Sequence, residues 1–256
     1  MDKQGFEAEA ERLIGAARER GVTLRLLGAL AFAHHCQRFG HLQQAMGRHY
    51  TDIDLAGYGR QGRDIQRLMA DLGYGEDRGV YVESEGSRLV FAHPGSGLHV
   101  DVFLDKLEFC HTISWNGRLE RDDPTIPLAE LLLEKMQIVQ INEKDVIDTV
   151  MLLLEHPLGA TDDETVNEEF IARLCGRDWG LWRTVTMNLG KVGQLAAGYR
   201  QLSEEEQRAV RSQTDALLER IEREPKSLAW KLRARVGDRK KWYRDVDELA
   251  PKLEEA

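Results

Sequence analysis

The sequence predicts an α/β (α+β) protein in which a mixed sheet with flanking helices is followed by an α-helical part. Short stretches with alternating apolar and polar residues, joined by Gly-containing turns, lie before residue 125. From residue 127 onward nearly every segment has helical periodicity instead. We therefore expect an α/β domain of residues 1–125 and a helical domain of residues 126–256.

The composition is typical of a folded protein with no membrane partner. Of 256 residues, 42% are hydrophobic and 31% are charged, and the net charge is -9. No apolar run approaches the roughly 18–20 residues of a membrane span, and acids stand where a signal peptide would carry basic residues. The three scattered cysteines imply neither a disulfide framework nor a zinc ribbon. We expect a cytoplasmic protein.

The first elements form a strand, a glycine turn and a helix. Residues 5–20 have helical periodicity, which ends at Gly21. Residues 22–27 are a short apolar run that ends at Gly28, and the Ala-rich stretch after this glycine predicts a helix.

The next strand has two chemically different faces. Residues 50–56 alternate, so that Asp52 and Asp54 share one face and Ile53 and Leu55 share the other. Residues 62–72 then predict an amphipathic helix that covers the sheet.

Further strands are expected in the rest of this domain. Three short runs within residues 79–105 (GVYVE, SRLVFAH and LHVDVFLD), separated by SEGS and PGSG, predict an antiparallel meander. Asn116-Gly117 predicts another hairpin within residues 113–120.

Asp101 is a third acid that could join Asp52 and Asp54. It lies in the third run of the predicted meander and alternates with Val100 and Val102. If its strand neighbours the first, three carboxylates converge, and such hard oxygen ligands select Mg²⁺ or Mn²⁺. A lone Asp-x-Asp pair is also typical of a turn or a solvated surface, and this alternative stays open.

The order of LLGAL, TDIDL and VDVF resembles the nucleotidyltransferase superfamily, which has the polymerase-beta-like fold. The resemblance covers roughly residues 22–155. It implies that Gly28 and Ala29 cradle the triphosphate of an NTP, that Asp52 and Asp54 bind metal, and that Asp101 binds metal or activates an acceptor hydroxyl. The family has Gly-Ser or Gly-Gly where this chain has Gly28-Ala29, so backbone N–H groups would have to hold the phosphates.

Two charged residues lie in apolar helical segments. Lys135 lies within the apolar stripe of the helix predicted over residues 127–142, and Asp148 is the single charge between residues 146 and 154. Each needs a partner if it is buried. These segments resemble abortive-infection and toxin-type nucleotidyltransferases, which implies that Lys135 and Asp148 belong to the nucleotide site and that Lys135 neutralises phosphate charge. A structural ion pair between them is the alternative.

Residues 225–244 are strongly basic, with eight Lys or Arg against the single Asp238. Trp230, Trp242 and Tyr243 are interleaved with these cations, a composition that suits RNA phosphates and stacked bases. A helix whose aromatic residues pack inward is the alternative.

The resemblance implies a magnesium-dependent enzyme that transfers a nucleoside monophosphate from an NTP to an acceptor hydroxyl and releases pyrophosphate. The acceptor stays open between tRNA or another RNA, a protein side chain and a small molecule. A toxin-like role would add an antitoxin protein as a partner. The alternative is an inactive nucleotidyltransferase-fold protein that binds a nucleotide or a partner protein for regulation.

Overall fold

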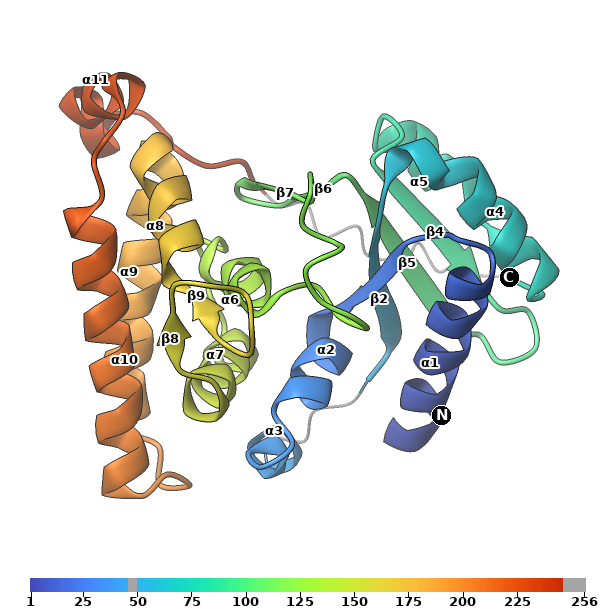
Figure 1. The fold of residues 1–256 in the computed structure, drawn as a ribbon, viewed down its shortest axis with the longest axis horizontal. Helices are drawn as coiled ribbons and strands as arrows, with labels where there is room; N and C mark the ends of the chain where they lie inside the picture. Colours follow the sequence, from blue (N-terminus) through green and yellow to red (C-terminus); the bar gives the residue numbers. More distant parts are fainter. Residues whose placement is uncertain (46–49, 246–256) are drawn as a thin grey trace.

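The computed structural model describes residues 1–45 and 50–245 and contains a five-stranded mixed sheet with the order β1-β2-β5-β4-β3 (Figure 1). Strands β2 and β5 are parallel, and the other neighbours are antiparallel. The mixed α/β class is therefore confirmed. The five strands are β1 (Leu24–Leu27), β2 (Asp52–Gly57), β3 (Gly75–Glu76), β4 (Arg88–Ala92) and β5 (His99–Leu104).

The two faces of the sheet differ as the alternation predicts. Ile53 and Leu55 of β2 are fully buried on the apolar face, with Val100 and Val102 of β5. Helices α1 (Lys3–Glu19) and α4 (Gly62–Asp71) cover this face, while α2 (Gly28–His35) lies on the opposite side of the sheet (Figure 1). The acidic face is thus turned toward the glycine turn and the helical part of the chain.

Two predicted strand segments, GVYVE and residues 118–120, are wrong, whereas residues 113 and 114 of the predicted hairpin do lie in a strand. The run GVYVE lies in α5 (Arg78–Glu83), because the Asp77 carboxylate accepts hydrogen bonds from the backbone N–H groups of Gly79 and Val80 and so begins a helix. The hairpin that does form pairs β6 (Lys106–Glu108) with β7 (Thr112–Ser114). Asn116 and Gly117 lie in consecutive turns after β7 and not between two strands. Trp115, which separates them from β7, is fully buried and fixes the position of the chain there.

The remaining part of the chain is mainly helical. Residues 124–126 pair with β1 and lead directly into α6 (Leu128–Met136), which is shorter than the predicted helix over residues 127–142. One continuous apolar core joins both parts, so the division at residue 125 stays a prediction. Within the described ranges, no helix is long and apolar enough to cross a bilayer.

The other described elements lie on either side of α6 in the sequence. A short helix, α3 (Gly40–Ala45), precedes β2, and a two-stranded sheet pairs β8 (Leu158–Gly159) with β9 (Val166–Asn167). The α-helices after α6 within the described residues are α7 (Glu143–Glu155), α8 (Glu168–Arg177), α9 (Trp179–Ala196), α10 (Glu204–Arg223) and α11 (Leu228–Val236).

Candidate metal and nucleotide site

The register between β2 and β5 brings three aspartates together. Asp54 lies directly opposite Asp101 in this parallel pair, and Asp52 shares their face because it precedes Asp54 by two residues. One carboxylate oxygen from each residue lies within 4.8 Å of the others. The expected convergence of the three acids is therefore present.

The chemistry of this cluster fits a hard divalent cation. Asp101 is 8% exposed, and its Oδ1 atom has no hydrogen-bond partner among the described residues. Burial raises the pKa of Asp54 well above its usual range, and the neighbouring carboxylates of Asp52, Asp101 and Glu134 raise it further. A bound Mg²⁺ or Mn²⁺ would satisfy the free oxygen and relieve this repulsion.

Gly28 lies against the cluster at the point where β1 ends and α2 begins. Its φ angle is +68°, and a Cβ atom built there would lie 2.3 Å from Oδ2 of Asp54. Only glycine at position 28 allows the Asp54 carboxylate to keep its observed position. The Gly28 N–H donates to Oε2 of Glu134 at 3.0 Å, so a carboxylate already engages this N–H.

Lys135 is surrounded by carboxylates. It is 8% exposed, and its Nζ atom lies 2.9 Å from Glu134, 3.5 Å from Asp148 and 3.8 Å from Asp145. Burial lowers the pKa of Lys135, but the attraction of Glu134, Asp148 and Asp145 outweighs burial and raises it above its usual value. Asp148 is fully buried and also accepts a hydrogen bond from Gln43 at 2.8 Å. The predicted Lys135–Asp148 ion pair is present, within a larger group of acids.

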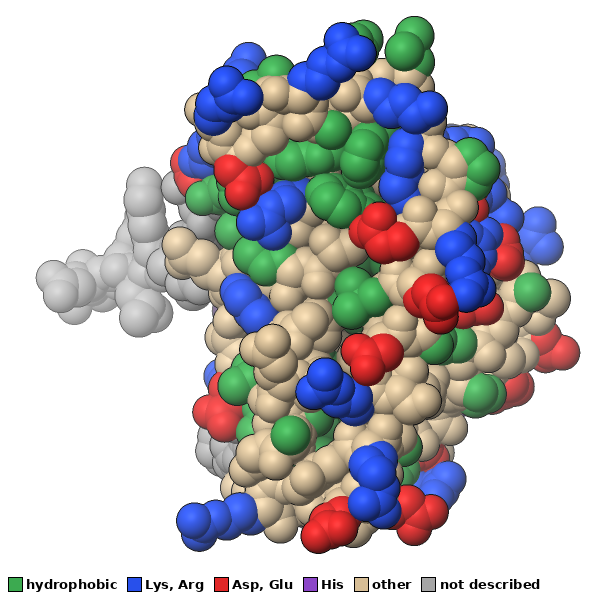
Figure 2. All heavy atoms as spheres, turned by 90° about the vertical axis from the view of Figure 1, so that its left-hand side faces the viewer, with side chains coloured by type: hydrophobic (Ala, Val, Ile, Leu, Met, Phe, Trp, Pro, Cys, Tyr) green, Lys and Arg blue, Asp and Glu red, His purple; other side chains and the backbone are tan. Residues whose placement is uncertain are grey.

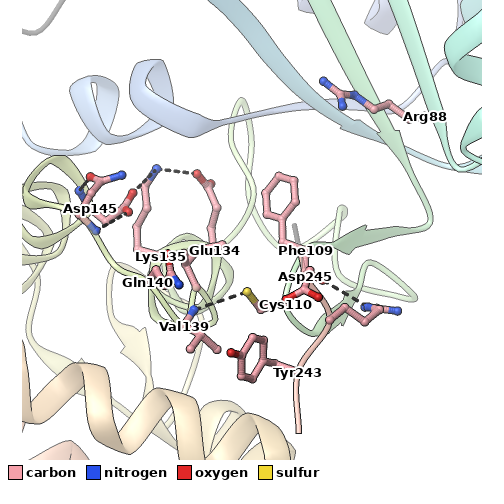
Figure 3. A pocket seen from close by; sticks show the side chains of 13 residues that line it. Arg88, Phe109, Cys110, Glu134, Lys135, Val139, Gln140, Asp145, Tyr243 and Asp245 are labelled. Carbon is pink, nitrogen blue, oxygen red and sulfur yellow. Dashed lines mark hydrogen bonds and ion pairs between the residues drawn. The ribbon is translucent and has the colours of Figure 1, made fainter. Parts of the chain in front are cut away.

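A cavity of about 540 Å³ opens beside these charges (Figure 3). Glu134, Lys135 and Asp145 line one side, and Arg88 projects from β4 on the other side. Such a volume suits a small ligand of nucleotide size. Of the residues predicted to bind nucleotide, Lys135 lines this cavity, whereas Gly28, Ala29 and Asp148 are not among its described lining residues.

Two residues of this region, Glu134 and Arg88, were missed in the sequence. Glu134 contacts both Gly28 and Lys135, and Arg88 donates from Nη2 to Oδ2 of Asp101 at 2.8 Å. The alternation of β4 could have placed Arg88 on the acidic face, because Leu89 is fully buried on the other.

The two tryptophans of the basic segment pack inward against α9. The Trp230 ring lies 5.1 Å from that of Trp182, and the Trp242 ring lies 6.2 Å from that of Trp179. The indole N–H of Trp242 donates to Thr184. Trp230 and Trp242 thus agree with the alternative prediction of a helix whose aromatic residues pack inward. Lys and Arg side chains gather around α11, at the top of the face drawn in Figure 2.

Comparisons of the chain with protein-family models, with curated proteins and with solved structures find no match. The resemblance to nucleotidyltransferases therefore stays a prediction.

Proposed function

We propose that this protein is a metal-dependent nucleotidyltransferase, which transfers a nucleoside monophosphate from an NTP to an acceptor hydroxyl. The observation that carries the proposal is the pairing of Asp54 with Asp101, with Asp52 alongside and Gly28 in contact with Asp54. This combines three hard ligands, which suit divalent cations, with a glycine turn at a helix N-terminus, which suits phosphates.

Each residue has a distinct role in the proposed reaction. Asp52, Asp54 and Asp101 would hold the cations, which when bound stabilise the charge that develops on the attacking and leaving oxygens. Lys135 would neutralise phosphate charge from the wall of the cavity. Asp145 and Asp148 would keep Lys135 charged and oriented.

The proposed transfer forms a bond between the acceptor oxygen and the α-phosphorus and breaks the bond from the α-phosphorus to the bridging oxygen of pyrophosphate. The proton of the acceptor hydroxyl needs a nearby base. The carboxylate oxygen of Asp101 that is not bound to metal is suited to accept it. Pyrophosphate leaves with the electron pair of the broken bond.

An RNA acceptor is favoured by the exposed cations of residues 225–244. Four cations of this segment are exposed: Lys231, Arg235, Arg239 and Lys240. The end of the same segment reaches the cavity beside Lys135, where Tyr243 and Arg244 line it. An RNA end could thus bind along this surface and enter the cavity. A protein or small-molecule acceptor would not need these cations.

One observation favours the alternative of an inactive, nucleotide-binding protein. The Gly28 N–H that would contact a phosphate already donates to Glu134, so this carboxylate must move before a phosphate can bind there. In the active enzyme Glu134 would move aside. In a regulatory binding protein it would remain in place.

Label transfer tests the proposal. The protein is incubated with each α-labelled NTP, Mg²⁺ or Mn²⁺ and total RNA, beside Asp54→Asn and the matched control Asp64→Asn, an exposed acid on α4. We expect transfer by the wild type and the control but not by Asp54→Asn. Metal-dependent NTP binding without transfer to RNA or to any other acceptor would support the binding alternative, and the absence of both would refute the proposed function.

A further inference from the structure

Arg88 neutralises one of the three acids in the observed arrangement. In the register of β4 and β5, Arg88 lies opposite Phe103 and therefore on the same face as Asp101. Its Nη2 atom donates to Oδ2 of Asp101 at 2.8 Å, and its guanidinium carbon lies 5.1 Å from the centre of the Phe103 ring. The Arg88 guanidinium thus engages one carboxylate oxygen of Asp101, which is a proposed metal ligand.

A divalent cation at the cluster would compete with this contact. Asp101 has one carboxylate oxygen with no partner in the described chain and one that Arg88 engages. An ion bound to Asp101 repels the guanidinium at close range and weakens its hold on Oδ2. Metal binding and the Arg88–Asp101 ion pair therefore oppose each other.

The cavity gives Arg88 a second place to bind. Arg88 lines it from β4, opposite Glu134 and Lys135 on α6 (Figure 3), and its side chain is 26% exposed. Its buried Nε atom also has no hydrogen-bond partner within the described residues. A planar guanidinium with a free donor is well suited to two oxygens of one phosphate group.

We propose that Arg88 is a substrate-binding residue that releases Asp101 and binds the phosphates of the substrate instead. Without metal it holds the Asp101 carboxylate. When a divalent cation binds Asp101, Arg88 turns into the cavity and binds a phosphate group beside Lys135. This inference rests on the metal site of the proposed function, and it makes metal binding and polyphosphate binding mutually reinforcing.

The test measures two affinities in the same variants. Mn²⁺ binding is followed by the electron paramagnetic resonance signal of the free ion, and inorganic tripolyphosphate binding is followed by calorimetry at saturating Mn²⁺. We expect Arg88→Ala to bind Mn²⁺ about tenfold more tightly and tripolyphosphate about tenfold more weakly than the wild type. Arg78→Ala, which removes an exposed arginine of the neighbouring α5, should change neither affinity.

The opposite signs of these changes separate the proposal from a structural role. If Arg88 had only a structural role, Arg88→Ala would bind both Mn²⁺ and tripolyphosphate more weakly. That result, or an unchanged Mn²⁺ affinity in Arg88→Ala, would overturn the exchange and leave the proposed metal site intact. Asp101→Asn should abolish Mn²⁺ binding, and a wild type that binds no Mn²⁺ would overturn the exchange and the proposed function alike. If circular dichroism shows that Arg88→Ala is unfolded, Arg88→Gln replaces it under the same criteria.

Discussion

Replacing Gly28 with alanine should displace Asp54. The new Cβ atom would lie 2.3 Å from Oδ2 of Asp54, far inside the contact distance of carbon and oxygen, so the carboxylate must rotate away. The φ angle of +68° adds about 1–2 kcal/mol of backbone strain for a residue with a Cβ atom. We expect the variant to lose both folding stability and a metal ligand, with Mn²⁺ affinity at least about tenfold lower, or roughly 1.4 kcal/mol.

Gly21 provides the matched control for this prediction. Its φ angle is also +68°, but apart from its chain neighbours no described residue would have a heavy atom within 4 Å of a Cβ atom there. Gly21→Ala therefore carries the backbone strain without the collision. Urea denaturation and Mn²⁺ titration of both variants separate the two effects. If Gly28→Ala binds Mn²⁺ as tightly as Gly21→Ala, the position of Asp54 does not determine metal binding and the reasoning is refuted.

Three further predictions concern buried groups. Lys135→Met removes a cation that three carboxylate neighbours share, and should lower the free energy of unfolding in urea by about 3–5 kcal/mol; a loss below about 1 kcal/mol would contradict the buried ion network. Burial lowers the pKa of His111 to about 4, so as the pH falls the unfolded chain binds a proton at this residue before the folded protein does. The free energy of unfolding should therefore decrease between about pH 6.5 and pH 4, by at most about 1.4 kcal/mol per pH unit. Urea denaturation should show a shallower loss in His111→Gln, and an equal loss would exclude His111 as the cause. Burial raises the pKa values of Cys36 and Cys175, so Ellman's reagent should modify these thiols only after denaturation; fast reaction of either in the native protein would contradict their burial.

The three aspartates could be predicted because period-2 alternation determines which face of a strand a residue occupies. Asp52 and Asp54 alternate with fully buried Ile53 and Leu55, so a slip in register would bury the acids. Alternation also placed Asp101 on a strand. It could not show that β2 and β5 are parallel neighbours, which is a property of the sheet as a whole.

The errors arose where a local hydrogen bond or a distant contact determines the structure. Val80 and Val82 favour a strand, but the cap at Asp77 begins a helix instead. Glu134 and Arg88 acquire their roles from contacts with Gly28 and Asp101, which lie 106 and 13 residues away in the sequence. No periodicity within a single segment reports such contacts.

The central claim is that Asp52, Asp54 and Asp101 together bind divalent cations. Anomalous diffraction from crystals soaked in Mn²⁺ tests it most directly, since the signal locates the metal without reference to activity. We expect one or two strong peaks within about 2.0–2.3 Å of oxygens from all three residues. Peaks elsewhere on the protein, or none at the cluster at millimolar Mn²⁺, would contradict the claim.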